Sequence, residues 1–107
     1  MMRIGEMIKI RPEKLEEYKY WHTNPWPEVT AMIKSCNIAN YTIYQRGELL
    51  FACYEYTGND FAKDMARMAA DPKTREWWSH TDPMQTPVVG ASEGVWWLPI
   101  KEVFHTD

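Results

Sequence analysis

The segment Leu49–Tyr56 constrains the fold most, because apolar side chains occupy both of its alternating positions. One parity carries Leu49, Phe51 and Cys53, and the other carries Leu50, Ala52, Tyr54 and Tyr56. Such a pattern is typical of a strand that is buried on both faces. Ile38–Gln45, also rich in aromatic and β-branched residues, precedes it across the short turn Arg46-Gly47-Glu48, in which Gly47 is free to take a positive φ. The two segments predict a β-hairpin at the centre of the fold.

The residues before the hairpin predict a first strand and a first helix. Arg3–Ile10 places its isoleucines on a single parity, which favours a strand. Pro12 suits the first position of a helix, and the glutamates that follow it lie near the positive end of the helix dipole. We therefore expect a helix that begins at Pro12 and runs through His22.

Asn24-Pro25-Trp26-Pro27 interrupts that helix. Pro25 disfavours helical geometry at Asn24, and neither proline can donate a backbone hydrogen bond. With Asn24 as N-cap and Pro25 at the first helical position, a second helical segment is expected from about Pro25 to Ser35. Its buried face would contain Val29, Met32 and Ile33.

The second half of the chain predicts a further helix and a final strand. Asn59–Ala70 has apolar residues at helical spacing, and a short segment after it runs through Trp78. Prolines and a glycine indicate a loop over Thr81–Gly94. Trp96–Phe104 has the pattern of a strand, in which Pro99 indicates an edge position or a bulge.

The resulting order, βαββαβ, predicts one α+β domain over residues 1–107, with a ferredoxin-like four-stranded antiparallel sheet. In that arrangement the helices cover one face of the sheet and leave the other face open. Because both parities of Leu49–Tyr56 are apolar, we expect a second copy of the chain to cover the open face in a homodimer.

Charge and hydropathy narrow the classes of partner. The 107 residues carry a net charge of -3, with 12 basic and 15 acidic side chains interspersed, so no basic patch indicates nucleic-acid binding. No apolar run approaches the roughly 18 residues that span a bilayer, and the first residues lack the apolar core of a signal peptide. We expect a soluble cytoplasmic protein with no nucleic-acid or membrane partner.

Cysteine and histidine spacing indicates neither a disulfide nor a metal site. Cys36 and Cys53 lack the spacing of a redox or zinc motif and predict free thiols, with Cys53 as a small buried hydrophobic residue of the hairpin. His80 and Asp82 are neighbours in sequence, but no third ligand stands at a recognisable spacing. We expect no metal and no cofactor.

The residues best suited to chemistry surround His22. Tyr18 precedes His22 by one helical turn, so the two side chains share a helix face. Trp26 follows between two prolines, and a second pair of indoles stands at Trp77-Trp78. An imidazole that exchanges protons near neutral pH, a tyrosine hydroxyl and indole faces together suit the binding and protonation of a polar ring such as a sugar.

These residues also carry a resemblance to a known family, which spans nearly the whole chain. Its marks are Glu17-Tyr18, His22, Trp26-Pro27-Glu28, Asn40-Tyr41-Thr42-Ile43-Tyr44, Trp77-Trp78 and Glu102-Val103-Phe104. The chain resembles the L-rhamnose mutarotases, small cofactor-free enzymes with a ferredoxin-like fold that form dimeric α/β-barrels and interconvert the anomers of a 6-deoxy-L-sugar. The resemblance implies that His22, assisted by Tyr18, is the catalytic acid, and that Tyr18, Tyr41, Trp77 and Trp78 bind the sugar.

Departures from the family pattern leave alternatives open. The family order His-Asn-Pro-x-Trp-Pro is replaced by His22-Thr23-Asn24-Pro25-Trp26-Pro27, and the loop after Trp78 also differs. L-fucose or another 6-deoxysugar therefore competes with L-rhamnose as the substrate. A non-catalytic metabolite-binding module on the same dimeric fold is a second hypothesis, and a cofactor-free monooxygenase is a third, by analogy of fold alone.

Overall fold

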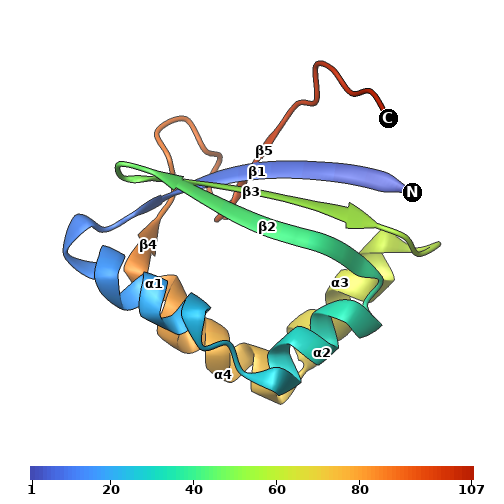
Figure 1. Ribbon diagram of the computed structural model, residues 1–107, viewed down its shortest axis with the longest axis horizontal. Helices are drawn as coiled ribbons and strands as arrows, with labels where there is room; N and C mark the ends of the chain where they lie inside the picture. The colour runs from blue at the N-terminus through green and yellow to red at the C-terminus, as the bar shows by residue number, and fades with distance from the viewer.

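The computed structural model describes residues 1–107 as an antiparallel sheet with all four α-helices against one face (Figure 1). Its strands are β1 (Met2–Ile10), β2 (Ile38–Arg46), β3 (Leu49–Tyr56), β4 (Gln85–Thr86) and β5 (Leu98–Ile100). They follow the order β2-β3-β1-β4, and β5 also pairs with β1. This arrangement confirms the predicted ferredoxin-like α+β fold.

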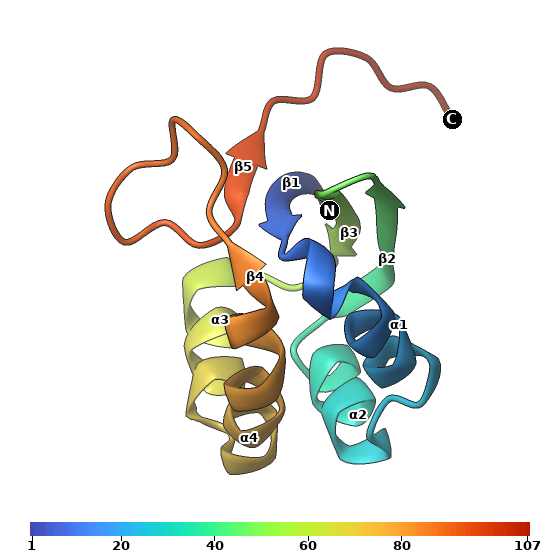
Figure 2. The same cartoon turned by 90° about the vertical axis from the view of Figure 1, so that its left-hand side faces the viewer.

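Under the sheet, α1 and α2 lie on one side and α3 and α4 on the other (Figure 2), and α4 contacts both α2 and α3. Their bounds are α1 (Leu15–Thr23), α2 (Pro27–Ser35), α3 (Phe61–Ala70) and α4 (Pro72–Thr81), with short 3-10 turns η1 (Pro12–Lys14) and η2 (Asp82–Met84). None of them combines the length and the apolar character that a membrane crossing needs.

The predicted start of α2, Pro25, is wrong, because the helix begins at the second proline of this stretch. The helix begins at Pro27, and Trp26 occupies the N-cap position without a side-chain hydrogen bond. Asn24 closes α1 instead, because its backbone N–H and its Nδ2 both donate to the Tyr20 carbonyl, at 3.2 and 3.3 Å. Pro25 therefore lies in the connection between the two helices.

The hairpin is confirmed, with an irregularity that the sequence analysis did not predict. Gly47 takes a φ of 56° in the turn. In β2 the register shifts between Ala39 and Thr42, so Asn40 and Tyr41 together stand opposite one residue of β3, Tyr54. This is a β-bulge.

The final strand is shorter than predicted, and the structure contains one further short strand, β4, that was not predicted. β4 lies inside the predicted loop Thr81–Gly94 and pairs with the end of β1, whereas β5 pairs with its middle at Gly5, Glu6 and Met7. Pro87 follows β4 directly, and a proline cannot donate to the ladder. Residues 101–107 form no strand and extend away from the sheet (Figure 1). Pro99 does lie on an edge strand, as predicted.

The core lies between the helices and the face of the sheet that we call the inner face. One apolar cluster consists of Ile8, Ile10, Tyr18, Leu50 and Met84. A second consists of Ile38, Tyr54 and Tyr56, with residues of α2 and α3 packed against it. The sheet therefore rests on two separate clusters rather than on one continuous core.

The opposite, outer face of the sheet carries no helix (Figure 1). Leu50, Ala52 and the two tyrosines of β3 are buried on the inner face, but Cys53 on the outer face is exposed. The prediction of a buried Cys53 is therefore wrong for the single chain, as is the burial of both faces of Leu49–Tyr56. Cys36 is buried, and both thiols are free, as predicted.

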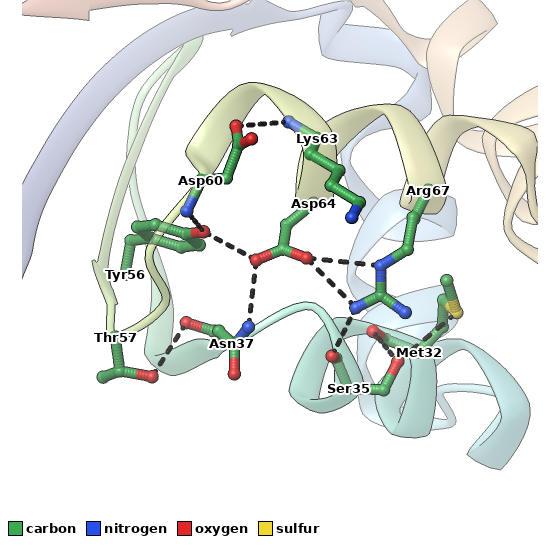
Figure 3. A network of polar contacts seen from close by, with 9 residues as sticks. All are labelled: Met32, Ser35, Asn37, Tyr56, Thr57, Asp60, Lys63, Asp64 and Arg67. Atoms are coloured by element: carbon green, nitrogen blue, oxygen red, sulfur yellow. Dashed lines mark hydrogen bonds and ion pairs between the residues drawn. The ribbon is translucent and has the colours of Figure 1, made fainter.

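A buried carboxylate joins α3 to the turn before β2 (Figure 3). Asp64 accepts hydrogen bonds from the Tyr56 hydroxyl at 2.6 Å, from Asn37 Nδ2 at 2.9 Å and from Arg67 Nε at 3.2 Å. Arg67 also donates to the Ser35 carbonyl at the end of α2. These bonds fix the entry to β2 just before the bulge.

Candidate active site

A cavity of about 820 Å³ opens between β2 and the helices. Its walls contain side chains of the end of α1, the connection that follows it, α2, the bulged part of β2, α3 and α4. Four of the five predicted site residues are among them: His22, Tyr41, Trp77 and Trp78. A volume of this size is typical of small-molecule sites, and most of the lining is apolar with a few polar groups.

His22 stands in the last turn of α1, where its ring is held in one orientation. Its Nδ1 lies 2.8 Å from the Tyr18 carbonyl oxygen, which can only accept, so Nδ1 carries the proton. Nε2 of the neutral ring is therefore left as an acceptor. Partial burial lowers the pKa of His22, and the bond to the carbonyl offsets this only in part. The neutral imidazole is thus the favoured form near pH 7.

Tyr18 lies behind His22 and is 4% exposed, so it supports the cavity wall rather than lining it. The two rings are stacked with centroids 4.1 Å apart. The Tyr18 hydroxyl accepts a bond from Gln85 Nε2 at 3.3 Å, and Gln85 in turn accepts one from Trp96 Nε1 at 3.0 Å. Burial raises the pKa of Tyr18 to about 12, which keeps its hydroxyl protonated.

Tyr41 reaches the cavity because of the bulge in β2. Asn40 takes a φ of 53°, a conformation that asparagine tolerates well, and its side chain donates to the Glu55 carboxylate. Tyr41 is thereby turned onto the inner face, where its ring stacks on Tyr54 with an interplanar angle of 4°. Burial, and then the negative charge of Glu6, raise the pKa of Tyr41.

Trp77 and Trp78 line the cavity from α4 with different degrees of burial. Trp77 is 6% exposed and packs edge-on against His22 and against the indoles of Trp21 and Trp26. Trp78 is half-buried and has none of these aromatic contacts. The adjacent indoles therefore have distinct surroundings, as their helical spacing predicts: Trp77 belongs to an aromatic cluster, and Trp78 presents more free surface.

Three residues around the site were missed in the sequence analysis. Asn40 sets the bulge and Gln85 holds Tyr18, but neither contact has a signal in the sequence, because each depends on how distant segments meet. Glu6 did have a signal, since it interrupts the isoleucine parity of the first strand. A lone carboxyl among buried isoleucines indicates a position where the inner face is not filled by apolar side chains.

Comparison with known proteins gives a consistent result over the whole chain. A family model described as L-rhamnose mutarotase matches residues 3–106. An L-rhamnose mutarotase of Sinorhizobium fredii is 32% identical over 108 residues and 98% of each chain. One of Phocaeicola vulgatus is 29% identical over 115 residues and 100% of each chain. The crystal structure of an L-rhamnose mutarotase from Formosa agariphila shares the fold, with a TM-score of 0.78 at 21% identity over 100% of both chains.

Proposed function

Because the chain belongs to the L-rhamnose mutarotase family, we propose that it interconverts the α and β anomers of L-rhamnose in the cavity between β2 and the helices, with His22 as a catalytic residue. The observation that carries the assignment of the site is the orientation of His22. Its Nδ1–H is engaged by the Tyr18 carbonyl, so Nε2 is the ring atom that is free to exchange a proton with a sugar.

Anomer exchange requires only that a hemiacetal open and close again. The neutral imidazole accepts the proton of the anomeric hydroxyl at Nε2 while the bond between C1 and the ring oxygen breaks, and that oxygen takes a proton from a general acid, a role that water can fill. Rotation about the C1–C2 bond then presents the other face of the aldehyde. On closure the imidazolium returns its proton to the carbonyl oxygen, so His22 acts as base in opening and as acid in closing.

The other predicted residues hold the sugar and the imidazole. Tyr41 presents a protonated hydroxyl beside the cavity, and Trp78 presents an indole face to the apolar side of a deoxysugar. Tyr18 assists through His22, because it supports the ring by stacking and fixes the proton of Nδ1 through its carbonyl. Orientation of this kind adds to the rate that positioned acid and base groups supply.

Exchange spectroscopy by NMR tests the proposal. Cross-peaks between the anomeric protons of L-rhamnose should grow faster with the protein than in buffer, and His22→Ala should return them to the buffer rate. His105→Ala, a change near the exposed C-terminus, is the matched control and should keep full activity. Exchange that is unaffected by His22→Ala would exclude His22 from catalysis.

The same experiment separates the alternatives. Faster exchange with L-fucose than with L-rhamnose would assign the site to a different 6-deoxysugar. Saturable sugar binding with exchange at the buffer rate would identify a binding module instead of an enzyme. The first result would overturn the proposed substrate, and the second would overturn the proposed activity.

We also propose that the outer face of the sheet pairs with a second copy of the chain. Tyr44 on this face is 61% exposed, Cys53 is exposed, and a hollow of about 420 Å³ lies over the strands there. Sedimentation velocity should give a dimer, and Tyr44→Glu should dissociate it. Gln45→Glu, on the other parity of β2, should not. A monomeric native chain would contradict this part of the proposal.

A further inference from the structure

We propose that Glu6 is the second proton-transfer group of the site, acting on the ring oxygen of the sugar while His22 acts on the anomeric hydroxyl. The inference rests on the proposed mutarotase function and adds a residue to it. Glu6 stands in the middle of β1, a central strand of the sheet, whereas His22 stands on α1, on the helical side of the cavity.

The register of the sheet fixes the side to which Glu6 points. β1 and β3 pair without a break, with Ile4 opposite Tyr54, Glu6 opposite Ala52 and Ile8 opposite Leu50. Directly opposed residues in an antiparallel pair project from the same face. Because Leu50, Ala52 and Tyr54 are buried on the inner face, Glu6 lies on that face too.

On the inner face, Glu6 lies between the two core clusters. Ile8 belongs to one of the two core clusters and Ile4 packs against the other, so Glu6 stands between them. Its cross-strand neighbour is the small Ala52, whose partner on the other side is Ile43, a residue that lines the cavity. On the inner face, the one small residue Ala52 therefore separates Glu6 from Ile43 in the wall of the cavity.

The charge of Glu6 affects the pKa of the tyrosine hydroxyls of this region. Its negative charge raises the pKa of Tyr41, a cavity residue, and that of Tyr54, on which Tyr41 stacks. Tyr41 is coupled in the same way to Tyr18. Glu6, Tyr54 and Tyr18 thus each raise the pKa of Tyr41, and the ring of His22 is stacked on that of Tyr18.

The carboxyl of Glu6 is not committed to a structural contact. Burial alone raises its pKa, with no contribution from a hydrogen bond or a neighbouring charge. No buried side-chain oxygen in the protein lacks a partner, so the unpaired oxygens of Glu6 must be open to solvent or to a ligand. Because burial raises its pKa, this half-buried carboxyl keeps its proton to a higher pH than an exposed carboxyl does, which suits it to give a proton to a ligand.

With Glu6 in this role, side chains of the protein supply or take up both protons that ring opening transfers. Nε2 of His22 takes the proton from the anomeric hydroxyl, the electrons of the C1–O5 bond move to O5, and Glu6 gives O5 its proton. The products are the open-chain aldehyde, an imidazolium and a carboxylate. Closure on the other face of the aldehyde reverses each transfer and restores both groups.

Glu6→Gln tests this assignment, because it removes the proton but keeps the size of the side chain. The anomer exchange rate should fall on the order of 10²-fold, the lower range for a positioned acid or base. The pH profile should also change shape. The wild type should lose activity on both sides of an optimum, whereas Glu6→Gln should lose it only on the acid side, where the imidazole becomes protonated.

None of the tyrosines around Glu6 produces such an alkaline limb. The pKa of Tyr18 and of Tyr54 is raised to about 12, that of Tyr41 is also raised, and the strand on the other side, β5, offers Pro99 opposite Glu6. A purely structural role for Glu6 would lower the rate equally at every pH. Glu6→Asp, which keeps the carboxyl, should retain both limbs at a reduced rate, and it serves as the test if Glu6→Gln does not fold.

Glu48→Gln, the same change in the exposed hairpin turn, is the matched control and should have the wild-type rate and profile. If the wild type exchanges anomers and Glu6→Gln keeps its rate and both limbs, Glu6 has no role in proton transfer and the proposed function stands. If the wild type does not exchange the anomers of any 6-deoxysugar, the proposed function fails, and this assignment fails with it.

Discussion

His22 donates its Nδ1–H to the Tyr18 carbonyl at 2.8 Å while its ring stacks on the Tyr18 ring at 4.1 Å between centroids. One helical turn of α1 thus fixes both the tautomer and the plane of the imidazole. No loop residue is needed to orient the group, so His22 is held before a ligand arrives. Such preorganisation limits the motion that must be suppressed when a sugar binds.

His22→Asn isolates the role of Nε2. The asparagine amide can still donate to the Tyr18 carbonyl, so the end of α1 keeps its hydrogen bond, but no atom remains where Nε2 stood. We expect a loss of 10²- to 10⁴-fold in the rate of anomer exchange, with little change in thermal unfolding. Exchange NMR and circular dichroism measure the two effects. A large fall in stability with a matching loss of activity would instead indicate that His22 is mainly structural.

Asn40 is expected to control the position of Tyr41 through the backbone. At a φ of 53° a β-branched residue is strained by about 1–2 kcal/mol, so Asn40→Val should displace the bulge and raise the KM for the sugar several-fold. Asn40→Gly loses the bond to Glu55 but accepts this φ, and its KM should stay close to that of the wild type. Equal effects of the two substitutions would show that the bond to Glu55, and not the backbone conformation, positions Tyr41.

Features that depend on neighbouring residues were predictable from the sequence, whereas features that depend on contacts between distant segments were not. The hairpin was predictable because alternation and a turn glycine act between neighbours, and Gly47 does take a positive φ. The bulge at Asn40 was not, because its register depends on pairing with Glu55 and Cys53 in another strand. The start of α2 was misplaced since the sequence offers two prolines, and only the bonds of Asn24 to Tyr20 decide between them.

The same difference between local and long-range contacts applies to the residues of the site. His22 and Tyr18 share a helix face by local spacing, so their association was predictable, and their role was indicated by the resemblance. Gln85 meets Tyr18 across 67 positions of sequence, which no local pattern encodes. The exposure of Cys53 was not predicted either. The apolar residues at alternate positions of its strand indicate that the outer face favours burial, but they do not show whether anything covers that face in a single chain.

The two adjacent indoles should separate stability from binding. Trp77 is 6% exposed and contacts three other aromatic rings, so Trp77→Ala should lower the free energy of unfolding by about 3–5 kcal/mol. Trp78→Ala, at a half-buried position, should cost much less stability and should mainly raise the KM for the sugar. Urea unfolding and exchange kinetics measure both variants. A reversed pattern would show that Trp77 supplies the stacking surface.

Asp64 should make stability depend on pH below the neutral range. Hydrogen bonds from Tyr56 and Asn37 lower the pKa of its carboxyl in the folded protein, so the folded state binds fewer protons than the unfolded chain. The resulting stability is present above the unfolded pKa of about 4 and is lost as the pH falls through the folded value. Asp64→Asn should therefore lower the Tm at pH 7, and its difference from the wild type should shrink below about pH 4. Glu13→Gln, on an exposed turn, is the control and should show no such convergence. A constant difference across this range would mean that the carboxylate charge contributes nothing and that the network of Figure 3 stabilises the fold by shape alone.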